Sequence, residues 1–476
     1  MQIFAPLQPA QERVGIAMSP RCGHHARRGN DGIKMARRTL DEWLDYQQRV
    51  HALGVDLGLA RVREVWQRMG APAVAPIVIT VGGTNGKGST VAFLEAMLAA
   101  TGRRVGCYTS PHLLRYHERI RVVGHDADDA ELIDAFERIE AARLEAGRAP
   151  IPLTYFEFGT LAALWIFAQS KLDAAVLEVG LGGRLDAVNI IDADAAIVTT
   201  VDLDHQDWLG NDRDSIAREK AGIFRAGRPA IVGDADAPAA LLESAARIGA
   251  DLYCAGRDYH IVTKAQGWSW RAADLDISLL EPVLAASVQR ANAAAAIAAL
   301  RTLRDRLQMS TEAFAAGVRN ARIAARLQRF VKPDTAELVV DVAHNPQAAR
   351  VLAQWLEENP PHGRNLAVFG ALADKDVAGI LTPLAAHMAH WFVGGLDADT
   401  PRGLGADDLV MRMRGVANSA HPTVTQALEA ALHEAGPDDR VLAFGSFFVA
   451  ASALEWAGTR GFRADLMLPP TATDPT

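Results

Sequence analysis

Short apolar runs alternate with longer stretches of helical periodicity along most of the chain. Runs of apolar and β-branched residues occur at Ile77–Val81, Val105–Thr109, Ala174–Val179, Ala195–Thr200 and Ala230–Val232. Parallel strands that helices cover on both faces have such continuous apolar sequences, because neither face meets water. The pattern therefore predicts an α/β fold with a doubly wound, mostly parallel sheet in the first part of the chain.

A second, shorter series of apolar runs follows. The chain has 476 residues, which exceeds what one hydrophobic core commonly supports, so this series predicts a smaller, Rossmann-like α/β domain. We expect the first domain to span residues 39–324 and the second residues 330–476, with a junction near Ala324–Lys332 after a helix around Asn292–Leu307. The expected strands of the second domain are Glu337–Val342, Leu366–Phe369, Trp391–Val393 and Val441–Phe444, and its expected helices include Pro346–Glu358 and Thr425–Ala435.

Residues 1–38 differ from the rest of the chain. They are rich in proline, glycine and charge, and they lack both an apolar period and the long apolar segment of a signal peptide. We therefore expect a disordered N-terminal extension, with Met35 as a candidate for the true start. Thr39, followed three residues later by Glu42, has the spacing of a capping box and predicts the first helix.

Composition argues against several classes of function. A net charge of −8 disfavours a nucleic-acid partner, since phosphate neutralisation needs a basic surface. No uninterrupted apolar run reaches the roughly 18 residues of a membrane span. Cys22, Cys107 and Cys254 are scattered without metal-ligand spacing, as reduced thiols are in cytoplasmic proteins. We expect a cytoplasmic protein with no nucleic-acid and no membrane partner.

The clearest chemistry lies in the segment Gly83-Thr84-Asn85-Gly86-Lys87-Gly88-Ser89. It stands between an apolar run and a helical pattern that begins near Thr90, where backbone N–H groups and the helix dipole favour an anion. The match to the Walker A pattern is imperfect. Gly82 and Gly86 are one residue too close, and Gly88 stands where Ser or Thr would follow the lysine. Taken alone, the segment is either a phosphate-binding loop or a glycine-rich turn with a solvated lysine.

This loop resembles the ATP loop of the Mur ligase superfamily of ATP-dependent carboxylate–amine ligases. From about Leu40 to near the C-terminus, further motifs follow in the order found in the folylpolyglutamate synthase/dihydrofolate synthase family. The motifs are Ser110-Pro111-His112-Leu113, Leu153–Glu157, Leu177–Asp186, Leu203-Asp204-His205, Arg218–Phe224 and Asp341–Pro346.

The resemblance implies an enzyme that adds L-glutamate to dihydropteroate and then to the γ-carboxyl of reduced folates. Activation of the acceptor carboxylate by ATP forms an acyl phosphate, and this step brings two anions together. Such a step needs metal and cationic clamps, which act by electrostatic stabilisation. We expect ATP and Mg²⁺, the latter at two sites, with Lys87, His205 and Lys220 as catalytic residues.

The metal ligands that the resemblance implies lie at or just beyond the carboxyl ends of predicted strands, the edge at which open α/β sheets bind ligands. Ser89, or Thr90 beside it, would hold the first metal. Ser110, Glu178 and His205 would hold the second. From the residues alone, Ser110 before a proline is typical of a turn and His205 of a surface loop, whereas Glu178 in an apolar run needs a cation.

Lys220 belongs to the Arg218–Phe224 motif, whose lysine is carbamylated in the family. Carbamylation turns the ammonium into an anion that can bind or orient a metal, so the resemblance places Lys220 among the metal ligands. From the residues alone, Lys220 would be a helix residue that is solvated or paired with Glu219.

The resemblance also implies which residues bind the two larger substrates. Ala324-Ala325-Arg326 stands where the family usually has Pro-Gly-Arg, which leaves the backbone of that turn open although the arginine is kept. Aromatic and polar side chains suit a flat pterin ring, yet Phe156, Phe158 and Leu161 also recur at near-helical spacing, as packed core would. The expected ATP-binding residues are Thr84, Asn85, Gly86, Lys87, Gly88, Ser89, Asn292, Arg326 and Asp341. The expected dihydropteroate-binding residues are Val55, Asp56, Leu57, Thr154, Tyr155, Phe156, Glu157, Leu185, Asp186 and Ala187.

Three alternatives to this bifunctional ligase stay open. An enzyme that only extends folates would share the same motifs. A ligase for peptidoglycan precursors should lack the Thr154–Glu157 segment. A non-catalytic nucleotide-binding switch would not need Glu178, His205 and Lys220 together. The hypothesis that we adopt is the bifunctional enzyme, acting as a monomer.

Overall fold

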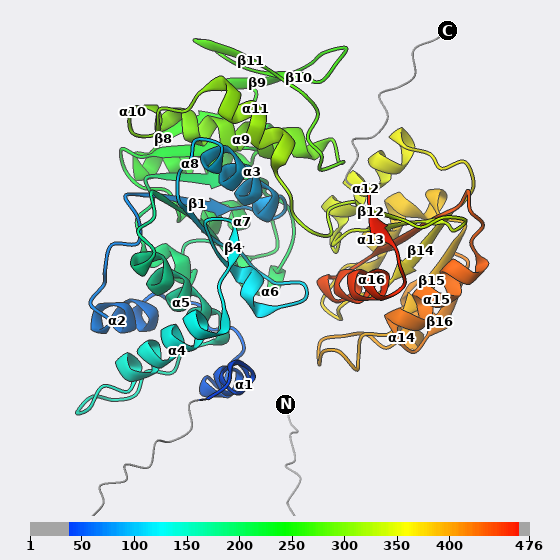
Figure 1. Cartoon of the computed structure of the whole chain (residues 1–476), viewed down its shortest axis with the longest axis horizontal. Coiled ribbons are helices and arrows are strands. Elements are labelled where there is room, and N and C mark those ends of the chain that lie inside the picture. Colours follow the sequence, from blue (N-terminus) through cyan, green and yellow to red (C-terminus); the bar gives the residue numbers. More distant parts are fainter. Residues whose placement is uncertain (1–37, 466–476) are drawn as a thin grey trace, which may run out of the picture. The chain divides into compact units, whose positions relative to one another are not determined.

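The computed structural model describes residues 38–465, whose strands form three sheets of eight, three and seven strands (Figure 1). We call them the N-terminal sheet, the small antiparallel sheet and the C-terminal sheet. Residues 1–37 of the predicted extension lie outside the described part of the chain. Thr39 then caps the first helix: its hydroxyl accepts from Glu42 N at 3.3 Å, and Glu42 Oε2 accepts from Thr39 N at 2.8 Å. The predicted capping box is confirmed.

The N-terminal sheet is doubly wound, as its sequence predicts. The predicted apolar runs form parallel strands that extend to both sides of β1, and β3 and β4 continue one edge in antiparallel pairing. In their order across the sheet, the strands are β4 (His125–Asp126), β3 (Ile120–Val122), β2 (Val105–Tyr108), β5 (Ala174–Glu178), β1 (Ile77–Gly82), β6 (Ala195–Val198), β7 (Pro229–Val232) and β8 (Asp251–Cys254).

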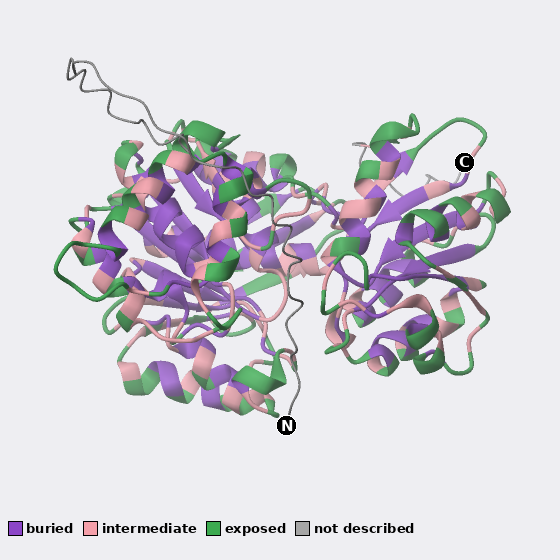
Figure 2. Cartoon of the chain, turned by 90° about the horizontal axis from the view of Figure 1, so that it is seen from below, coloured by how far each residue is buried: buried purple, intermediate pink, exposed green. Residues whose placement is uncertain are grey.

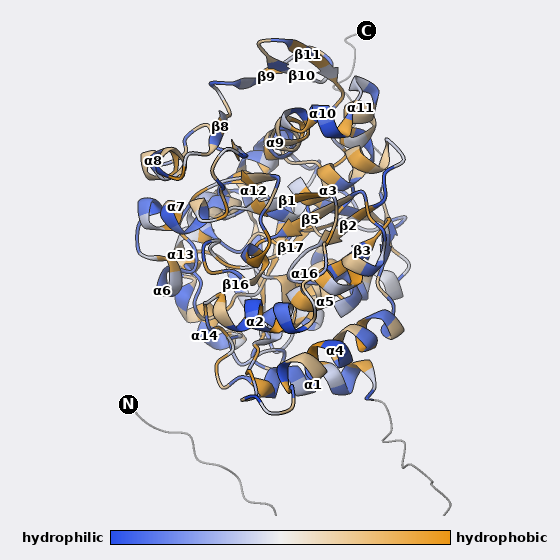
Figure 3. Cartoon of the chain, turned by 90° about the vertical axis from the view of Figure 1, so that its left-hand side faces the viewer, coloured by the Kyte–Doolittle hydropathy of each residue, from blue (hydrophilic) through white to orange (hydrophobic). Residues whose placement is uncertain are grey.

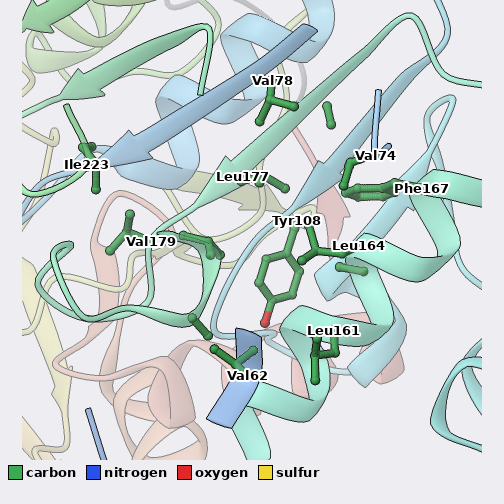
Figure 4. Packing of buried hydrophobic residues seen from close by; sticks show 14 of the residues in the cluster. Val62, Val74, Val78, Tyr108, Leu161, Leu164, Phe167, Leu177, Val179 and Ile223 are labelled. Carbon is green, nitrogen blue, oxygen red and sulfur yellow. The ribbon is translucent and has the colours of Figure 1, made fainter. Parts of the chain in front are cut away.

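Alternate residues of these strands enter two hydrophobic cores. Val78 and Leu177 pack in the core on one face (Figure 4). Buried residues of α1, α2, α4, α5, α7 and α8 belong to the same core. Ile79 and Val176 pack on the other face, beneath α3, α9 and α11. Figure 2 shows the strands buried and the exposed residues on the outer helices, which explains the continuous apolar runs. The helices are α1 (Leu40–Val50), α2 (Ala60–Arg68), α3 (Lys87–Ala99), α4 (Asp129–Arg143), α5 (Tyr155–Gln169), α6 (Gln206–Leu209), α7 (Arg213–Ala221), α8 (Ala239–Ile248), α9 (Val288–Thr302), α10 (Arg304–Leu307) and α11 (Thr311–Asn320).

The small antiparallel sheet was not predicted. Its strands β9 (Tyr259–Thr263), β10 (Trp268–Ala272) and β11 (Leu275–Leu279) pair in antiparallel register. Trp270 attaches the sheet to α9, because its Nε1 donates to Ala294 O at 3.2 Å. Exposed polar positions interrupt β9 and β11, so these short strands lack the continuous apolar sequence that marked the parallel ones.

The C-terminal sheet contains the second series of predicted strands. They are parallel, and β12 and β18 add an antiparallel edge. The sheet begins along the chain with β12 at Gln328, within the segment expected as the junction. The strand before Asp341, β13, is therefore the second strand of this sheet in chain order. The expectation that it is the first was wrong. In order, the strands are β16 (Asn418–His421), β15 (His390–Gly394), β14 (Asn365–Phe369), β17 (Arg440–Phe444), β13 (Glu337–Val340), β12 (Gln328–Val331) and β18 (Arg463–Ala464).

Helices cover this sheet on both faces as well. Val339 and Phe369 pack against α12, α13 and α14, whereas Val340 and Val368 pack against α15 and α16. Hydrophobic residues concentrate in the strands, and hydrophilic residues in outer helices such as α2 and α6 (Figure 3). Among the helices of residues 38–465, none is long and apolar enough to cross a membrane. The helices are α12 (Pro346–Glu358), α13 (Val377–Leu384), α14 (Ala406–Arg412), α15 (Val424–Glu434) and α16 (Phe447–Thr459).

Candidate active site

A cavity of about 1800 Å³ is lined by residues of both larger sheets. The carboxyl ends of β1, β2 and β5 open into it, together with the segments that follow β6 and β13. This is the edge at which open α/β sheets bind ligands. In the described part of the chain, none of the residues expected to bind dihydropteroate lines the cavity, whereas all those expected to bind ATP or metal do. These are Thr84, Asn85, Gly86, Lys87, Gly88, Ser89, Ser110, Glu178, His205, Lys220, Asn292, Arg326 and Asp341.

The predicted phosphate loop joins β1 to α3. The helix begins at Lys87, earlier than the Thr90 expected from the pattern. Gly83 has a φ of 143° and would place a Cβ 1.9 Å from Thr199 Oγ1, so this position requires glycine. Lys87 Nζ donates to the carbonyl oxygens of Gly83 and Thr84, each at 3.1 Å. The ammonium therefore lies over the loop, beside the first turn of α3, where the helix dipole favours an anion.

The segment that follows β6, together with α9, holds the loop in place. Thr200 accepts from Thr84 N through its carbonyl at 2.8 Å and from Asn85 N through its hydroxyl at 3.0 Å. Gly86 lies so close to α9 that a Cβ there would be 2.4 Å from Asn292 Oδ1. Asn292, predicted to bind ATP from a distant part of the sequence, is thus in contact with the loop.

Glu178 is the buried carboxylate at the end of β5. Ser110 N donates to its Oε2 at 3.2 Å, which joins the ends of β2 and β5. Burial raises the pKa of Glu178, although Lys87, the Ser110 amide and Arg326 favour the charged form. Within residues 38–465 no cation lies within ion-pair distance of this carboxylate, so a bound cation would satisfy it.

The donor set around Glu178 fits a hard divalent cation. Ser89 lines the cavity, whereas the Thr90 hydroxyl donates to Gly86 O at 3.0 Å. Ser89 is thus the better placed of the two residues considered for the first metal. Among the described residues, no group of three or more His, Cys, Asp and Glu side chains converges on one point. A metal here would therefore complete its shell with hydroxyl, water and phosphate oxygens, as Mg²⁺ commonly does.

Lys220 lies on α7 and is buried, with 3% of its surface exposed. Burial, together with the nearby positive charge of Lys87, lowers its pKa to about 7. The pairing with Glu219 considered from sequence does not form: Glu219 binds Arg184 at 2.8 Å instead. In the described chain no carboxylate pairs with Lys220, so near neutral pH a large fraction of its amine is uncharged.

His205 follows β6 and precedes α6. It lines the cavity with an exposed side chain, and its backbone N–H donates to Asp204 Oδ1 at 2.9 Å. Its φ of 51° is in the left-handed region, which is uncommon for a residue other than glycine and recurs at functional sites. The structure therefore places the imidazole at the same sheet edge as Ser110 and Glu178.

Arg326 and Asp341 come from the start of the C-terminal sheet. Asp341 accepts from Leu327 N at 2.8 Å and from Ala343 N at 2.7 Å, and the Arg326 guanidinium lies 5.7 Å from the centre of the Phe447 ring. Ala325, where the family usually has glycine, has a φ of 54°. The turn thus keeps a left-handed conformation without glycine, and it directs Arg326 toward the cavity.

A polar network that the sequence did not reveal connects the phosphate loop with the C-terminal sheet. Asn85 Nδ2 donates to Asn345 Oδ1 at 3.0 Å, and Asn345 Nδ2 donates to Asp204 Oδ2 at 3.2 Å. Lys375 Nζ donates to Asp204 Oδ1 at 2.7 Å. Burial would raise the pKa of Asp204, but His344 and Lys375 hold it well below its usual range. Asn345 also caps α12, because its side chain accepts from Ala348 N at 2.9 Å.

The segments expected to bind dihydropteroate are brought together outside the cavity lining. Arg61 joins two of them, since its guanidinium binds Asp56 Oδ2 at 2.6 Å and Glu157 Oε1 at 3.1 Å. Phe158 and Leu161 are core residues of α5, whereas Phe156 is only partly buried. Part of the Thr154–Glu157 segment thus stays available for a ligand. Arg61 was missed because its link to Glu157 spans 96 residues of the sequence.

Asp186 belongs to the third of these segments and is buried. Its carboxylate accepts from Leu181 N at 2.8 Å and from Val188 N at 3.1 Å. Burial raises its pKa to about 7, against the effect of these amides. At neutral pH the side chain therefore exchanges between a carboxylate and a neutral acid that can donate a hydrogen bond.

Two families of known proteins match the chain. The Mur ligase middle domain matches residues 81–300, and the Mur ligase, glutamate ligase domain matches residues 325–447. The dihydrofolate synthase/folylpolyglutamate synthase of Escherichia coli strain K12 is 43% identical over 416 residues, which cover 87% of this chain and 95% of that protein. The protein of the same name from Haemophilus influenzae is 36% identical over 436 residues, which cover 87% of this chain and 96% of that relative.

A solved structure of Escherichia coli FolC in complex with DHPP and ADP superposes with a TM-score of 0.83 at 42% identity, covering 89% of this chain and 98% of that one. A bifunctional folylpolyglutamate synthase/dihydrofolate synthase with Mn, AMPPNP and L-glutamate bound gives a TM-score of 0.80 at 42% identity, covering 88% and 98%. The similarity thus extends over both larger sheets.

Proposed function

Because the chain belongs to the dihydrofolate synthase/folylpolyglutamate synthase family of the Mur ligases, we propose that it ligates L-glutamate to dihydropteroate and to the γ-carboxyl of reduced folates. ATP drives both reactions. Membership confirms the resemblance that the motifs indicated. One observation carries the proposal: the Gly83–Ser89 loop, the buried Glu178 and Lys220, and Arg326 and Asp341 from the other sheet all line one cavity.

In the proposed reaction, a carboxylate oxygen of the acceptor attacks the γ-phosphorus of ATP. The bond from that phosphorus to the β–γ bridging oxygen breaks, and ADP departs. The amine of L-glutamate then attacks the acyl carbon and expels phosphate, with loss of a proton from nitrogen. Lys87 would neutralise the transferred phosphoryl group, and Asn292, Arg326 and Asp341 would hold the nucleotide.

The residues around Glu178 fit Mg²⁺, which would neutralise phosphate charge when bound. Ser89 would hold one ion, and Ser110, Glu178 and His205 a second one. The absence of an ion-pair partner for Glu178 in the described chain supports this assignment, as does the bound Mn of a solved relative.

Size-exclusion chromatography coupled to light scattering tests the accompanying expectation of a monomer, whose whole site comes from a single chain.

We further assign a carbamate to Lys220. Its burial and its pKa of about 7 support the assignment, because the neutral amine must attack CO₂ to form the N–C bond with release of a proton. A carbamate would also carry the negative charge that a metal site requires. Enzyme equilibrated with ¹³C-labelled bicarbonate should show a carbamate carbon by NMR, and the signal should be missing from Lys220→Ala. A wild-type spectrum without that signal would refute the assignment.

Dihydropteroate would be bound by the segments that Arg61 and Asp186 organise, in the region of residues 39–324, while residues 330–476 would complete the ATP site and provide part of the ligase centre. Polyglutamylation alone is the remaining alternative. Phosphate release should depend on glutamate with either dihydropteroate or tetrahydrofolate as the sole acceptor. Activity with tetrahydrofolate alone would favour the alternative, and activity with neither would refute the ligase.

Lys87→Ala is the matched inactive control. It should lower kcat/KM by two or more orders of magnitude, because a cation facing the transferred phosphoryl group commonly contributes several kcal/mol. Lys264→Ala removes an exposed lysine of the small antiparallel sheet and should leave both activities unchanged. A Lys87→Ala enzyme with more than about a third of wild-type turnover would remove Lys87 from the catalytic set.

A further inference from the structure

Arg119 is a buried cation without an anionic partner in the described part of the chain. It ends the 3₁₀ turn η1 (Tyr116–Arg119), exposes 8% of its surface and lines the cavity. Its Nε donates to His112 Nδ1 at 2.8 Å. Within residues 38–465, no carboxylate lies within ion-pair distance of its guanidinium. Among the described residues, neither terminal nitrogen has a hydrogen-bond partner, so both can donate to a ligand in the cavity.

The position of Arg119 is fixed from several sides. Thr109 N donates to Arg119 O at 2.9 Å, which attaches the residue to the end of β2, directly before the predicted metal ligand Ser110. The guanidinium carbon lies 5.3 Å from the centre of the Tyr116 ring and 5.5 Å from that of Tyr155. Arg119 therefore lies between the Ser110 segment, which reaches the catalytic edge, and the Thr154–Glu157 segment.

Burying a charge without a partner is costly, so a folded chain keeps one where a ligand compensates it. Arginine suits a carboxylate in particular, because its planar fork can donate two parallel hydrogen bonds. His112 occupies Nε and holds the guanidinium plane, which leaves the terminal nitrogens for a ligand. The Gly83–Ser89 loop and Lys87 are already assigned to the phosphates of ATP, which leaves Arg119 for another anion.

We propose that Arg119 binds the carboxylate of the acceptor, the group that receives the phosphoryl from ATP. The inference rests on the proposed function, because it takes dihydropteroate or a folate as the acceptor. While one carboxylate oxygen forms its bond to phosphorus, the guanidinium keeps the other oxygen in place and offsets the repulsion between the two anions. Arg119 would thus position the carboxylate between Tyr155 and Ser110.

A comparison of two ligands tests this contact. Dihydropteroate and dihydropteroamide, in which a neutral carboxamide replaces the carboxylate, are titrated calorimetrically into the full-length enzyme with ADP and Mg²⁺. Wild type should bind the acid at least about tenfold more tightly than the amide, since a charged bidentate contact is lost with the amide. In Arg119→Gln and Arg119→Met this preference should fall below about twofold, with the affinity for the amide little changed.

Arg138→Gln serves as the matched control. Arg138 also lies over an aromatic ring, 5.2 Å from the centre of Trp165, but it is exposed and is not among the described residues that line the cavity. This variant should keep the wild-type preference. Arg119→Met also checks folding: because it removes an uncompensated buried charge, its melting temperature without ligand should equal or exceed that of wild type.

Two results would overturn the inference. Arg119→Met could keep the preference for the acid, or it could lose affinity for acid and amide by the same factor, as a purely structural residue would. A variant that melts well below wild type would likewise show that Arg119 serves the fold. A wild-type enzyme that binds and converts neither acceptor would instead refute the proposed function, and the inference with it.

Discussion

Buried charges around the cavity fall into two groups, according to whether the protein itself compensates them. Asp204 and Lys375 pair with each other at 2.7 Å. Glu178, Lys220 and Arg119 have no ion-pair partner in the described part of the chain, although each is at least nine-tenths buried. An uncompensated charge lowers stability, so we interpret the second group as the residues whose partners are ligands, metal or CO₂.

Asp186 gives a pH-dependent prediction at this scale. Its pKa is near 3.8 in the unfolded chain and about 7 in the folded one, so between these values the folded state retains a proton that the unfolded state has released. Stability therefore falls as pH rises from about 4 to about 7. Asp186→Asn removes this effect, and its melting temperature relative to wild type should increase between about pH 5 and about pH 8.

Asp251→Asn, at an exposed position of β8, provides the control for replacing a carboxylate by an amide at the surface. Thermal denaturation without substrates measures both variants. If the difference between Asp186→Asn and wild type stays constant across this range, the carboxyl of Asp186 does not titrate there.

Short connecting elements set the geometry of the site, and the turn before β12 has alanine where the family usually has glycine. Ala325 there has a φ of 54° and is fully buried. A left-handed conformation costs an L-residue about 1–2 kcal/mol. Glycine avoids this cost but loses about 0.5–1 kcal/mol in conformational entropy. The glycine that is usual in the family thus avoids a backbone strain that Ala325 carries in this chain.

Ala325→Gly should consequently leave the free energy of unfolding unchanged or raise it by up to about 1 kcal/mol. Ala349→Gly, in the buried interior of α12, has no strain to relieve and should lose about 1 kcal/mol. Chemical denaturation of both variants measures the contrast. Equal losses at the two positions would show that the turn carries no strain.

The burial and length of each element explain which elements the sequence could predict. Strands such as β5 were recognisable because burial on both faces leaves a continuous apolar run, and the order of loops along the sheet edge placed Glu178 near the Gly83–Ser89 loop. By contrast, β12 has only four residues, and it shares exposed positions with the strands of the small antiparallel sheet. Such short, partly exposed segments resemble loops in sequence. Arg61 and Arg119 were not predicted, because an arginine's partners, or the lack of them, depend on segments distant in the chain: Arg61 and Glu157 are 96 residues apart.

At the scale of the whole molecule, the Asp204–Lys375 pair links the two larger sheets. Asp204 follows β6, and Lys375 precedes α13. Removing one member of a buried pair commonly costs about 3–5 kcal/mol, because the other charge stays behind. Lys375→Met and Asp204→Asn should each destabilise the enzyme, whereas the double variant should lose less than the sum, with a coupling energy of about 1–3 kcal/mol. Additive losses would show that the pair does not couple the sheets.

Activation of the dihydropteroate carboxylate as an acyl phosphate is the step on which the proposed function depends. It is tested most directly with dihydropteroate whose carboxylate carries ¹⁸O, incubated with the enzyme, ATP, Mg²⁺ and L-glutamate. With both carboxylate oxygens labelled, phosphate leaves with the oxygen that attacked the phosphorus. We therefore predict one ¹⁸O atom in each phosphate released and a dihydrofolate that keeps the other ¹⁸O in its new amide carbonyl. Dihydrofolate formed together with unlabelled phosphate, or no glutamate-dependent product from dihydropteroate at all, would contradict it.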